Sequence, residues 1–312
     1  MQQRRTHVCL FIVPARSQAG QSTSHGETGA VSQNDPPAAE GYAWAAHPVT
    51  RRDADQLETV RANRAWWDAE AVDYYAEHGE FLGDNELTWG PEGLRESSAH
   101  LLGEVAGMRV LEIGCGGGQC SRWVAGQGAA GVVASDVSSG MLERARRINN
   151  TLADPRLRVP LVQCDGAALP FPDDTFDVVF TAYGVVPFVA DSARVMVEAA
   201  RVLRPGGRLV FSTTHPVRWA MPDDPSEEGL RVTQSYFDRT PYVEQDPAGQ
   251  ATYVEHHRTF GDRIREIVAA GLRVVDVVEP EWPEANLQTW AGWSQLRGQL
   301  IPGTAIFVCR KD

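Results

Sequence analysis

The pattern of apolar and polar residues changes near residue 50. Residues 14–41 contain one large aliphatic side chain, Val31, among Ser, Gln, Gly, Ala, Thr and Pro. Such a segment buries too little apolar surface to offset the entropy that a chain loses when it becomes ordered. We therefore predict a disordered tail over residues 1–50 and one folded domain over residues 51–312.

The start of this domain has the spacing of an amphipathic helix. From Leu57 to His78, mostly apolar and aromatic residues recur at steps of three and four, which places them on one helix face. A second helix is predicted over about residues 93–105. The positions on the first face are Leu57, Val60, Arg64, Trp67, Ala71, Tyr74 and His78.

Beyond residue 106, short β-rich runs alternate with helical segments. This alternation predicts an α/β fold with a doubly wound, mostly parallel sheet of seven strands. Helices are expected from about residue 118 and over residues 139–149, 192–203 and 261–270. Strands are expected over residues 109–113, 132–135, 161–164, 178–181, 209–212, 274–278 and 305–309.

A glycine-rich turn stands where the first of these strands ends and a helix begins. It reads Glu112-Ile113-Gly114-Cys115-Gly116-Gly117-Gly118, and glycines there allow a tight turn with a ligand close to the main chain. A dinucleotide site requires a third glycine five residues after Gly114, where this chain has Gln119. Glu112 would also repel a diphosphate. A ligand that carries an ammonium and a sulfonium, and no phosphate, has the opposite preference.

Two further acids end the second and third strands. Asp136 is placed to accept hydrogen bonds from both hydroxyls of a ribose, a feature shared with NAD sites. Asp165 is placed to accept a hydrogen bond from a donor such as an exocyclic amine. Each acid alone is equally explained as a turn residue or helix N-cap. Together with Glu112 and the glycine turn, they favour a site for one nucleoside that carries an amino acid.

These residues resemble the class I S-adenosylmethionine-dependent methyltransferases, closest to the small-molecule, quinone-biosynthesis-like (type 11) branch, and the chain looks like an actinobacterial member. Residues 112–118 match the family's E/D-x-G-x-G-x-G. Asp136 with Met141-Leu142, Asp165-Gly166-Ala167, residues 176–179 and residues 201–207 resemble the motifs that follow, in the same order. The resemblance covers about residues 60–312. It implies strand order 3-2-1-4-5-7-6, with strand seven antiparallel.

The resemblance implies S-adenosyl-L-methionine as cofactor. It also implies a helical lid over residues 51–106, a cofactor-binding core over 107–212, and a substrate-side insertion with the last strands over 213–312. A tyrosine of the lid, matched by Tyr74, is expected to reach the methionine end of the cofactor. The expected cofactor-binding residues are Tyr74, Glu112, Gly114, Cys115, Gly116, Gly118, Asp136, Val137, Met141, Asp165, Gly166, Ala167 and Ala182.

Composition and absent motifs narrow the acceptor. With 29 Lys and Arg against 41 Asp and Glu, the net charge is −12, which disfavours nucleic acid as a partner. Residues 181–184 read Thr-Ala-Tyr-Gly, not the N/D-P-P-Y of enzymes that methylate exocyclic amines, and no Pro-Cys pair is present. The five cysteines form no C-x-x-C pair, and no apolar run approaches a membrane span. We expect a cytoplasmic enzyme that acts on a small molecule.

One histidine is a candidate general base. His215 follows the fifth strand, at the sheet edge where doubly wound folds bind ligands. The competing interpretation is that His215 caps backbone groups ahead of Pro216, and this is the more frequent role of a lone histidine. His256 and His257 have no third ligand at useful spacing, so we expect a solvated pair and no metal site.

The tryptophans gather outside the motif-bearing stretch. Only Trp123 lies within residues 110–212, whereas the expected lid and insertion hold Trp66, Trp67, Trp89, Trp219, Trp282, Trp290 and Trp293. They predict either an apolar or aromatic substrate pocket or a separate small core of the lid. Two other functions stay open at this point. One is an NAD-dependent oxidoreductase, and the other is a non-catalytic module that binds S-adenosylmethionine.

Overall fold

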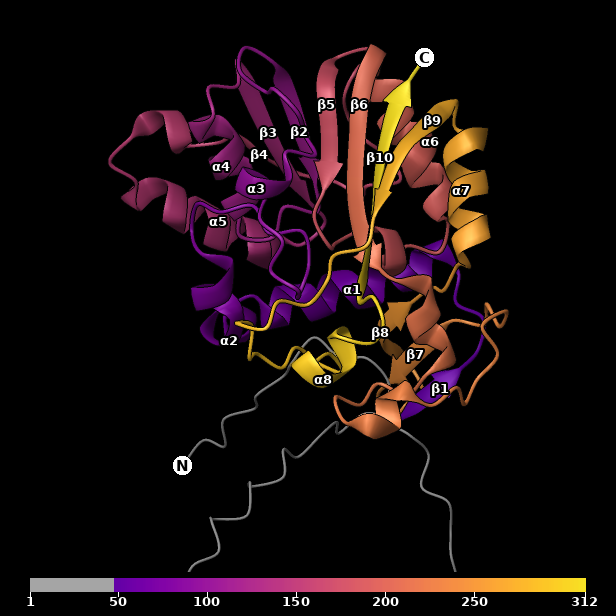
Figure 1. Cartoon of the computed structure of the whole chain (residues 1–312). Coiled ribbons are helices and arrows are strands. Elements are labelled where there is room, and N and C mark those ends of the chain that lie inside the picture. Colours follow the sequence, from indigo (N-terminus) through magenta and orange to yellow (C-terminus); the bar gives the residue numbers. More distant parts are fainter. Residues whose placement is uncertain (1–47) are drawn as a thin grey trace, which may run out of the picture.

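The computed structural model describes residues 48–312, which are built around a seven-stranded sheet (Figure 1). The strand order is β4-β3-β2-β5-β6-β10-β9. The strands β2 to β6 pair in parallel, and β10 is antiparallel to both β6 and β9. The predicted fold class and strand order are therefore confirmed. The strands are β2 (Arg109–Ile113), β3 (Gly131–Asp136), β4 (Leu161–Gln163), β5 (Phe176–Thr181), β6 (Leu203–Thr214), β9 (Leu272–Val278) and β10 (Thr304–Lys311).

Helices cover both faces of this sheet. On one face, α6 (Ser192–Val202) and α7 (Phe260–Ala269) pack on a core that includes Leu111 and Phe211. On the other, α4 (Gln119–Gly126) and α5 (Ser139–Thr151) pack on a core that includes Val110 and Phe180. Neighbouring strand residues thus serve opposite cores, which is why these strands read as apolar runs. Four short 3₁₀ helices are η1 (Pro155–Leu157), η2 (Val186–Phe188), η3 (Pro216–Ala220) and η4 (Glu227–Leu230).

The predicted helix from Leu57 to His78 is two helices, α1 (Gln56–Glu70) and α2 (Asp73–Leu82). The side chain of Asp55 caps α1 by accepting a hydrogen bond from the Glu58 amide. Leu57, expected on the apolar face, is 70% exposed. The chain turns between the helices so that α2 can dock on the glycine turn through a tyrosine described below. Tertiary contact therefore overrides the continuous helical pattern.

The predicted helix over residues 93–105 is also shorter than expected, because only α3 (Glu96–Ala99) forms. The buried carboxylate of Glu96 accepts hydrogen bonds from the Leu101 and Leu102 amides and from the Trp89 indole. Since the side chain of Glu96 takes these amides, the backbone does not continue as a helix. His100 adopts a positive φ of 53° and ends the turn.

A second sheet was not predicted. It joins β1 (Val49–Arg51), β7 (Tyr242–Gln245) and β8 (Ala251–Glu255) in the order β1-β7-β8. Because β1 pairs antiparallel with β7, the predicted boundary of the tail at residue 50 is wrong. The rest of that tail, residues 1–47, lies outside the described residues.

The end of β8 also corrects the prediction of a solvated histidine pair. His256 and His257 follow β8 and are only 4% and 1% exposed. The His256 ring is hydrogen-bonded to the Thr59 hydroxyl, and the His257 ring to the Tyr236 carbonyl. Burial lowers the pKa of each ring to about 4, so both are neutral packing residues at pH 7.

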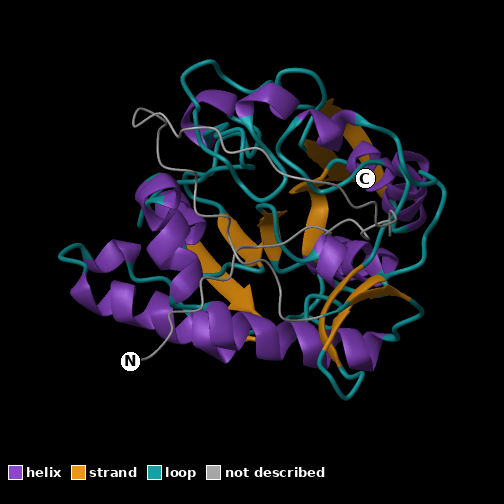
Figure 2. Ribbon diagram, turned by 90° about the horizontal axis from the view of Figure 1, so that it is seen from below, coloured by secondary structure: helices purple, strands orange, loops and turns teal. Residues whose placement is uncertain are grey.

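Helix α1 runs across the carboxyl ends of the parallel strands (Figures 1 and 2). Its Asn63 donates hydrogen bonds to the carbonyls of Phe188 and Val254 and accepts one from the Val254 amide. Asp68 accepts hydrogen bonds from the amide of Gly140 and the hydroxyl of Ser138 at the start of α5. Helix α1, the first part of the predicted lid, is therefore tied to η2, to β8 of the second sheet and to the start of α5.

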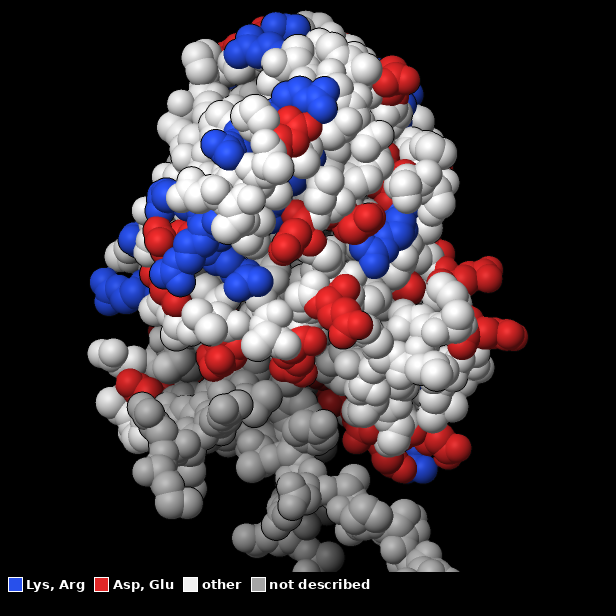
Figure 3. Space-filling model, turned by 90° about the vertical axis from the view of Figure 1, so that its left-hand side faces the viewer, with Lys and Arg blue, Asp and Glu red and all other residues white. Residues whose placement is uncertain are grey.

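The remaining short helix is α8 (Gln295–Gly298), beneath the sheet in Figure 1. Within residues 48–312, the helices are all too short or too polar to cross a bilayer. On the face that Figure 3 shows, basic and acidic side chains are interspersed.

The pairing of β1 predicts a loss of stability on truncation. Removal of residues up to Arg52 eliminates the β1–β7 pairing and the Arg51 hydrogen bonds to Thr240 and Gln234. We expect a chain that starts at Asp53 to melt roughly 3–8 °C below one that starts at Pro48. Differential scanning calorimetry of the two chains makes the comparison, and equal melting temperatures would show that β1 adds no stability.

Candidate functional site

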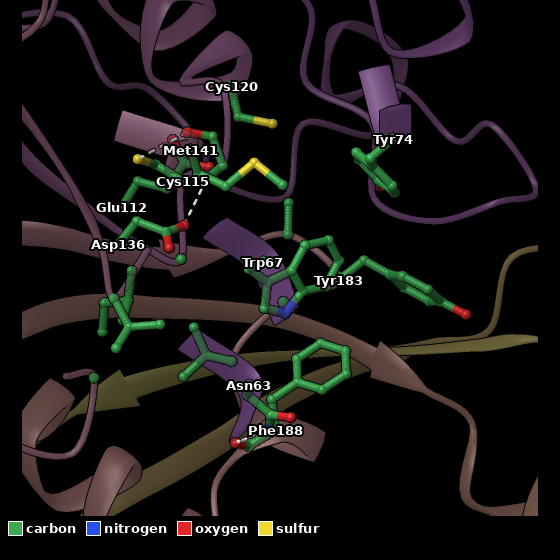
Figure 4. A pocket seen from close by; sticks show the side chains of 18 of the residues that line it. Asn63, Trp67, Tyr74, Glu112, Cys115, Cys120, Asp136, Met141, Tyr183 and Phe188 are labelled. Atoms are coloured by element: carbon green, nitrogen blue, oxygen red, sulfur yellow. Dashed lines mark hydrogen bonds between the residues drawn. The ribbon is translucent and has the colours of Figure 1, made fainter. Parts of the chain in front are cut away.

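A deep cavity lies between α1 and the carboxyl edge of the large sheet. Its empty space, including the part open to solvent, is about 1380 Å³. Among the predicted site residues, those that line it are Tyr74, Glu112, Gly114, Cys115, Gly116, Asp136, Val137, Met141, Asp165, Gly166 and Ala182. Figure 4 shows several of these side chains around the open space.

The glycine turn is shaped from two sides. Gly114 has a φ of +72°, and a Cβ atom there would collide with Cγ2 of Val185 in the loop after β5. A Cβ on Gly117 would lie 2.6 Å from the Tyr75 hydroxyl oxygen. Only glycine therefore fits at these two positions, and the backbone of the turn stays open toward the cavity.

Tyr75, which was not predicted, anchors the turn. Its hydroxyl accepts a hydrogen bond from the Gly117 amide at 2.5 Å and donates one to Oε1 of Gln119 at 3.0 Å. The neighbouring Tyr74, which the resemblance favoured, lines the cavity and packs edge-to-face on Trp67 and on Tyr75 itself. The lid thus reaches the turn through Tyr75 and the open space through Tyr74.

Glu112 is buried at the end of β2, 2% exposed, and lines the cavity. It accepts a hydrogen bond from the hydroxyl of Ser121 on α4. Burial raises the pKa of the Glu112 carboxyl to about 8, although the Ser121 hydrogen bonds oppose the shift. At pH 7 the carboxyl is therefore mostly protonated, and a cation beside it would favour the ionised form.

Asp136 ends β3 and is held by two backbone amides. Its Oδ2 accepts from Gly116 at 2.8 Å, and its Oδ1 accepts from Ser138 at 2.9 Å. Burial raises the pKa of Asp136, and the two amides oppose this rise. Both oxygens keep further acceptor capacity, which suits a diol on the cavity side.

Asp165 follows β4 and links the lid to the sheet edge. Its Oδ1 accepts from the Ala167 amide at 2.9 Å, and its Oδ2 accepts from Nε2 of Gln56 at 3.2 Å. Gln56 also accepts a hydrogen bond from the Ala190 amide. The first turn of α1 therefore closes the cavity beside Asp165.

Three predicted site residues do not line the cavity. Gly118 is the N-cap of α4 and does not face the cavity. The amide of Ala167 donates a hydrogen bond to Asp165. His215 has both ring nitrogens engaged, since Nε2 is 2.8 Å from Oε1 of Glu279 and Nδ1 accepts from the Val217 amide. His215 is the N-cap of η3. His215 therefore lies outside the cavity lining, and its contacts support the capping interpretation.

The cavity wall also carries several aromatic side chains. Trp67, Tyr74, Phe81, Phe188 and Trp290 line it. Trp290 also stacks on His78 of α2, with ring centroids 3.9 Å apart. Four other tryptophans, Trp89, Trp219, Trp282 and Trp293, are at most 4% exposed. Trp67 and Trp290 therefore line the cavity, whereas Trp89 and Trp219 belong to packed cores.

The residues that sequence reasoning missed come from the lid and from loops. Asn63, Gln56 and Tyr75 are polar positions on α1 and α2 whose role depends on tertiary contact. Tyr183, another cavity residue, has a positive φ of 59°, which no local pattern predicts. The one usable signal was the Tyr74-Tyr75 pair within the lid, which offers two tyrosines where the resemblance asked for one.

Comparisons with known proteins agree with this geometry. The family model described as "Methyltransferase domain" matches residues 111–211. A demethylmenaquinone methyltransferase of Corynebacterium kroppenstedtii is 31% identical over 227 residues, which is 70% of this chain and 85% of that relative. The methyltransferase GfsG of Streptomyces halstedii is 34% identical over 148 residues. That match covers 47% of this chain, and this chain spans only about half, 48%, of that relative's length.

A solved structure shows the same fold. The S-adenosylmethionine-dependent methyltransferase from Mesorhizobium loti superposes with a TM-score of 0.55 at 28% identity, over 71% of this chain and 100% of the other. Its name matches the cofactor that the glycine turn and the three acids favour. This chain belongs to the S-adenosylmethionine-dependent methyltransferases.

Proposed function

We propose that this protein transfers a methyl group from S-adenosylmethionine to a small molecule with an aromatic ring. The observation that carries the proposal is one cavity whose wall combines acids with aromatic side chains. Glu112, Asp136 and Asp165 are the acids, and Trp67, Phe188 and Trp290 are among the aromatic residues. In support, the Corynebacterium relative is named for demethylmenaquinone, a quinone.

The three acids of the cavity wall suit the polar groups of S-adenosylmethionine. Asp136 would hold the ribose hydroxyls, Asp165 the adenine side, and Glu112 the ammonium of the methionine part. Gly114 and Gly116 leave the backbone accessible beside these groups. When bound, S-adenosylmethionine supplies a methyl group already activated by a positively charged sulfur.

The protein's own contribution to transfer is to position the acceptor and exclude water. Helix α1 covers the cavity through its polar ties, and the aromatic walls orient a flat acceptor toward the acids. Such positioning lowers a barrier by up to about 7–11 kcal/mol. The cavity's Glu112, Asp136 and Asp165 are assigned to the cofactor, and no histidine of the described chain lines the cavity. We infer an acceptor that is already nucleophilic or ionised, because a base is needed only to remove a proton.

The two alternatives predict different binding. An NAD-dependent oxidoreductase would bind a diphosphate at the glycine turn, where Gln119 stands in place of the third glycine of the dinucleotide motif. A non-catalytic module would bind S-adenosylmethionine and transfer nothing. Methyl-labelled S-adenosylmethionine offered with a panel of phenols, quinols and aromatic amines distinguishes them, since label in an acceptor supports the proposal. No labelled product with any acceptor, together with tight cofactor binding, would favour the module.

Asp136 gives the sharpest test of cofactor placement. Asp136→Asn removes the charge that receives the ribose, so we expect S-adenosylmethionine affinity to fall by on the order of 2–4 kcal/mol. Isothermal titration calorimetry measures the affinity for S-adenosylmethionine. The matched control is Asp276→Asn, an exposed position on the edge strand β9. Wild-type affinity in Asp136→Asn contradicts the ribose assignment, and tighter binding of NAD than of S-adenosylmethionine contradicts the function.

Paired tyrosine variants test how the lid contacts the turn. Tyr75→Phe removes the hydrogen bonds to Gly117 and Gln119, so S-adenosylmethionine should bind more weakly by about 1 kcal/mol. Tyr74→Phe keeps the ring that packs on Trp67, and its affinity should stay within about twofold of wild type. A larger loss of affinity in Tyr74→Phe than in Tyr75→Phe would contradict this account. It would show that Tyr74 contacts the cofactor, as the family resemblance implies.

The raised pKa of Glu112 predicts that the protein releases a proton when S-adenosylmethionine binds. In the free protein its pKa of about 8 keeps it protonated at pH 7, and the arriving cation lowers that pKa. Binding of S-adenosylmethionine at pH 7 should therefore release close to one proton. The heats of calorimetric titration in two buffers of different ionisation enthalpy give the number of protons released. The Glu112→Gln variant should reduce this number to near zero. Equal proton release in wild type and variant would exclude Glu112 as the source.

A further inference from the structure

Gln119 brings a polar side chain to the glycine turn, on the wall of the cavity. It is the half-buried first residue of α4 and lines the open space. It also stands at the position where a dinucleotide motif has glycine. A side-chain amide adds one acceptor and one donor group with two hydrogens to this wall. The partners of these two groups decide which ligand the turn can hold.

The amide oxygen of Gln119 is already bound. The Tyr75 hydroxyl accepts a hydrogen bond from the Gly117 amide at 2.5 Å, so its own proton is left to donate to Oε1 of Gln119 at 3.0 Å. Burial raises the pKa of Tyr75, so the hydroxyl keeps that proton at neutral pH. The Gln119 amide is therefore held in one of its two orientations, which leaves Nε2 for another partner.

The amide nitrogen of Gln119 is open to a ligand. Within residues 48–312, the one side-chain hydrogen bond of Gln119 uses its oxygen. Its nitrogen is not one of the enclosed polar atoms that lack a partner, which include the hydroxyl of Tyr183. Nε2 therefore keeps accessible surface, and the side chain that carries it belongs to the cavity wall. An acceptor atom of a bound molecule is the partner that this donor lacks.

Glu112 and Gln119 meet the cavity at the same helical turn. Ser121, two residues after Gln119, binds the Glu112 carboxyl through both its hydroxyl and its backbone amide. The group assigned to the ammonium of S-adenosylmethionine is therefore attached to the first turn of α4. In that cofactor one carbon atom carries both the ammonium and a carboxylate. A cofactor with its ammonium at Glu112 must place its carboxylate close to the same turn.

This carboxylate has no basic side chain to meet it. No Lys or Arg of the described chain lines the cavity, whereas Glu112, Asp136 and Asp165 do. An anion removed from water is destabilised unless hydrogen-bond donors surround it. Hydrogen bonds to a charged acceptor are also stronger than those between neutral groups. The oriented Nε2 group of Gln119 is a neutral donor that suits this task.

We propose that Gln119 binds the carboxylate of S-adenosylmethionine through its side-chain nitrogen, with Tyr75 fixing the orientation of the amide. The inference rests on the proposed function and adds a residue that selects the cofactor by its amino-acid part. The residue that departs from the dinucleotide motif thus has a positive role. Through Tyr75, helix α2 of the lid takes part in this selection.

The test compares S-adenosylhomocysteine with its decarboxylated analogue, which keeps the ammonium and lacks only the carboxylate. Isothermal titration calorimetry should show that the wild type prefers S-adenosylhomocysteine roughly ten- to hundredfold, the effect of one hydrogen bond to a charged group. Gln119→Glu keeps an acceptor for the Tyr75 hydroxyl but replaces the donor with a negative charge. It should bring the preference to about one or below and leave the affinity for the analogue undiminished.

Two further variants separate recognition of the carboxylate from a general effect on the fold. Gln119→Met removes the donor without adding charge, and it should also bring the preference close to one. Gln127→Glu makes the charge change at the exposed far end of α4 and should keep the wild-type preference.

Three outcomes would overturn the proposal. They are a wild-type preference near one, an unchanged preference in the Gln119 variants, and an equal loss of affinity for both ligands in those variants. Failure of the wild type to bind either ligand would instead overturn the proposed function.

Discussion

The position of helix α1 over the carboxyl ends of the strands is the constraint on which the site depends. Asn63 holds that position with one side-chain amide, which satisfies buried backbone groups of Phe188 and Val254 at 2.8–2.9 Å. Buried backbone groups need partners, so α1 cannot leave without exposing them or leaving them unpaired. The second sheet thereby stabilises the lid, and the lid in turn forms one wall of the cavity.

The glycine turn depends on the same arrangement. Val185 approaches Gly114 from the loop after β5, and Tyr75 approaches Gly117 from α2. The turn is therefore enclosed by the sheet on one side and by the lid on the other. This explains why the turn needs glycine for steric reasons as well as for access to a ligand.

Sequence reasoning predicted the parts of this protein that depend on local pattern. Strands buried on both faces read as apolar runs, and Gly114, Asp136 and Asp165 follow strands whose carboxyl ends must meet at one edge. Parts that depend on tertiary contact were missed. Tyr75 docks only because α1 and α2 diverge, which a continuous helical pattern does not reveal.

The second sheet was missed, and the role of His215 stayed open between two interpretations, for related reasons. The strands β7 and β8 are short and flank a polar turn, so the sequence predicts an irregular segment there. The sheet becomes evident only from the pairing of β1 with β7 and of β7 with β8. His215 follows the correct strand for a catalytic base, yet its ring turns to Glu279 and the Val217 amide. Chain position places a residue at the sheet edge but does not decide which way its side chain points.

Hydrogen–deuterium exchange with and without S-adenosylhomocysteine tests the central claim most directly. If the cofactor occupies the cavity beneath α1, exchange should slow in the glycine turn, at the end of β3 and in α1, while β9 at the far edge of the sheet stays unchanged. NAD at the same concentration should protect none of these segments. Protection absent from the turn and α1 at saturating S-adenosylhomocysteine would contradict the account.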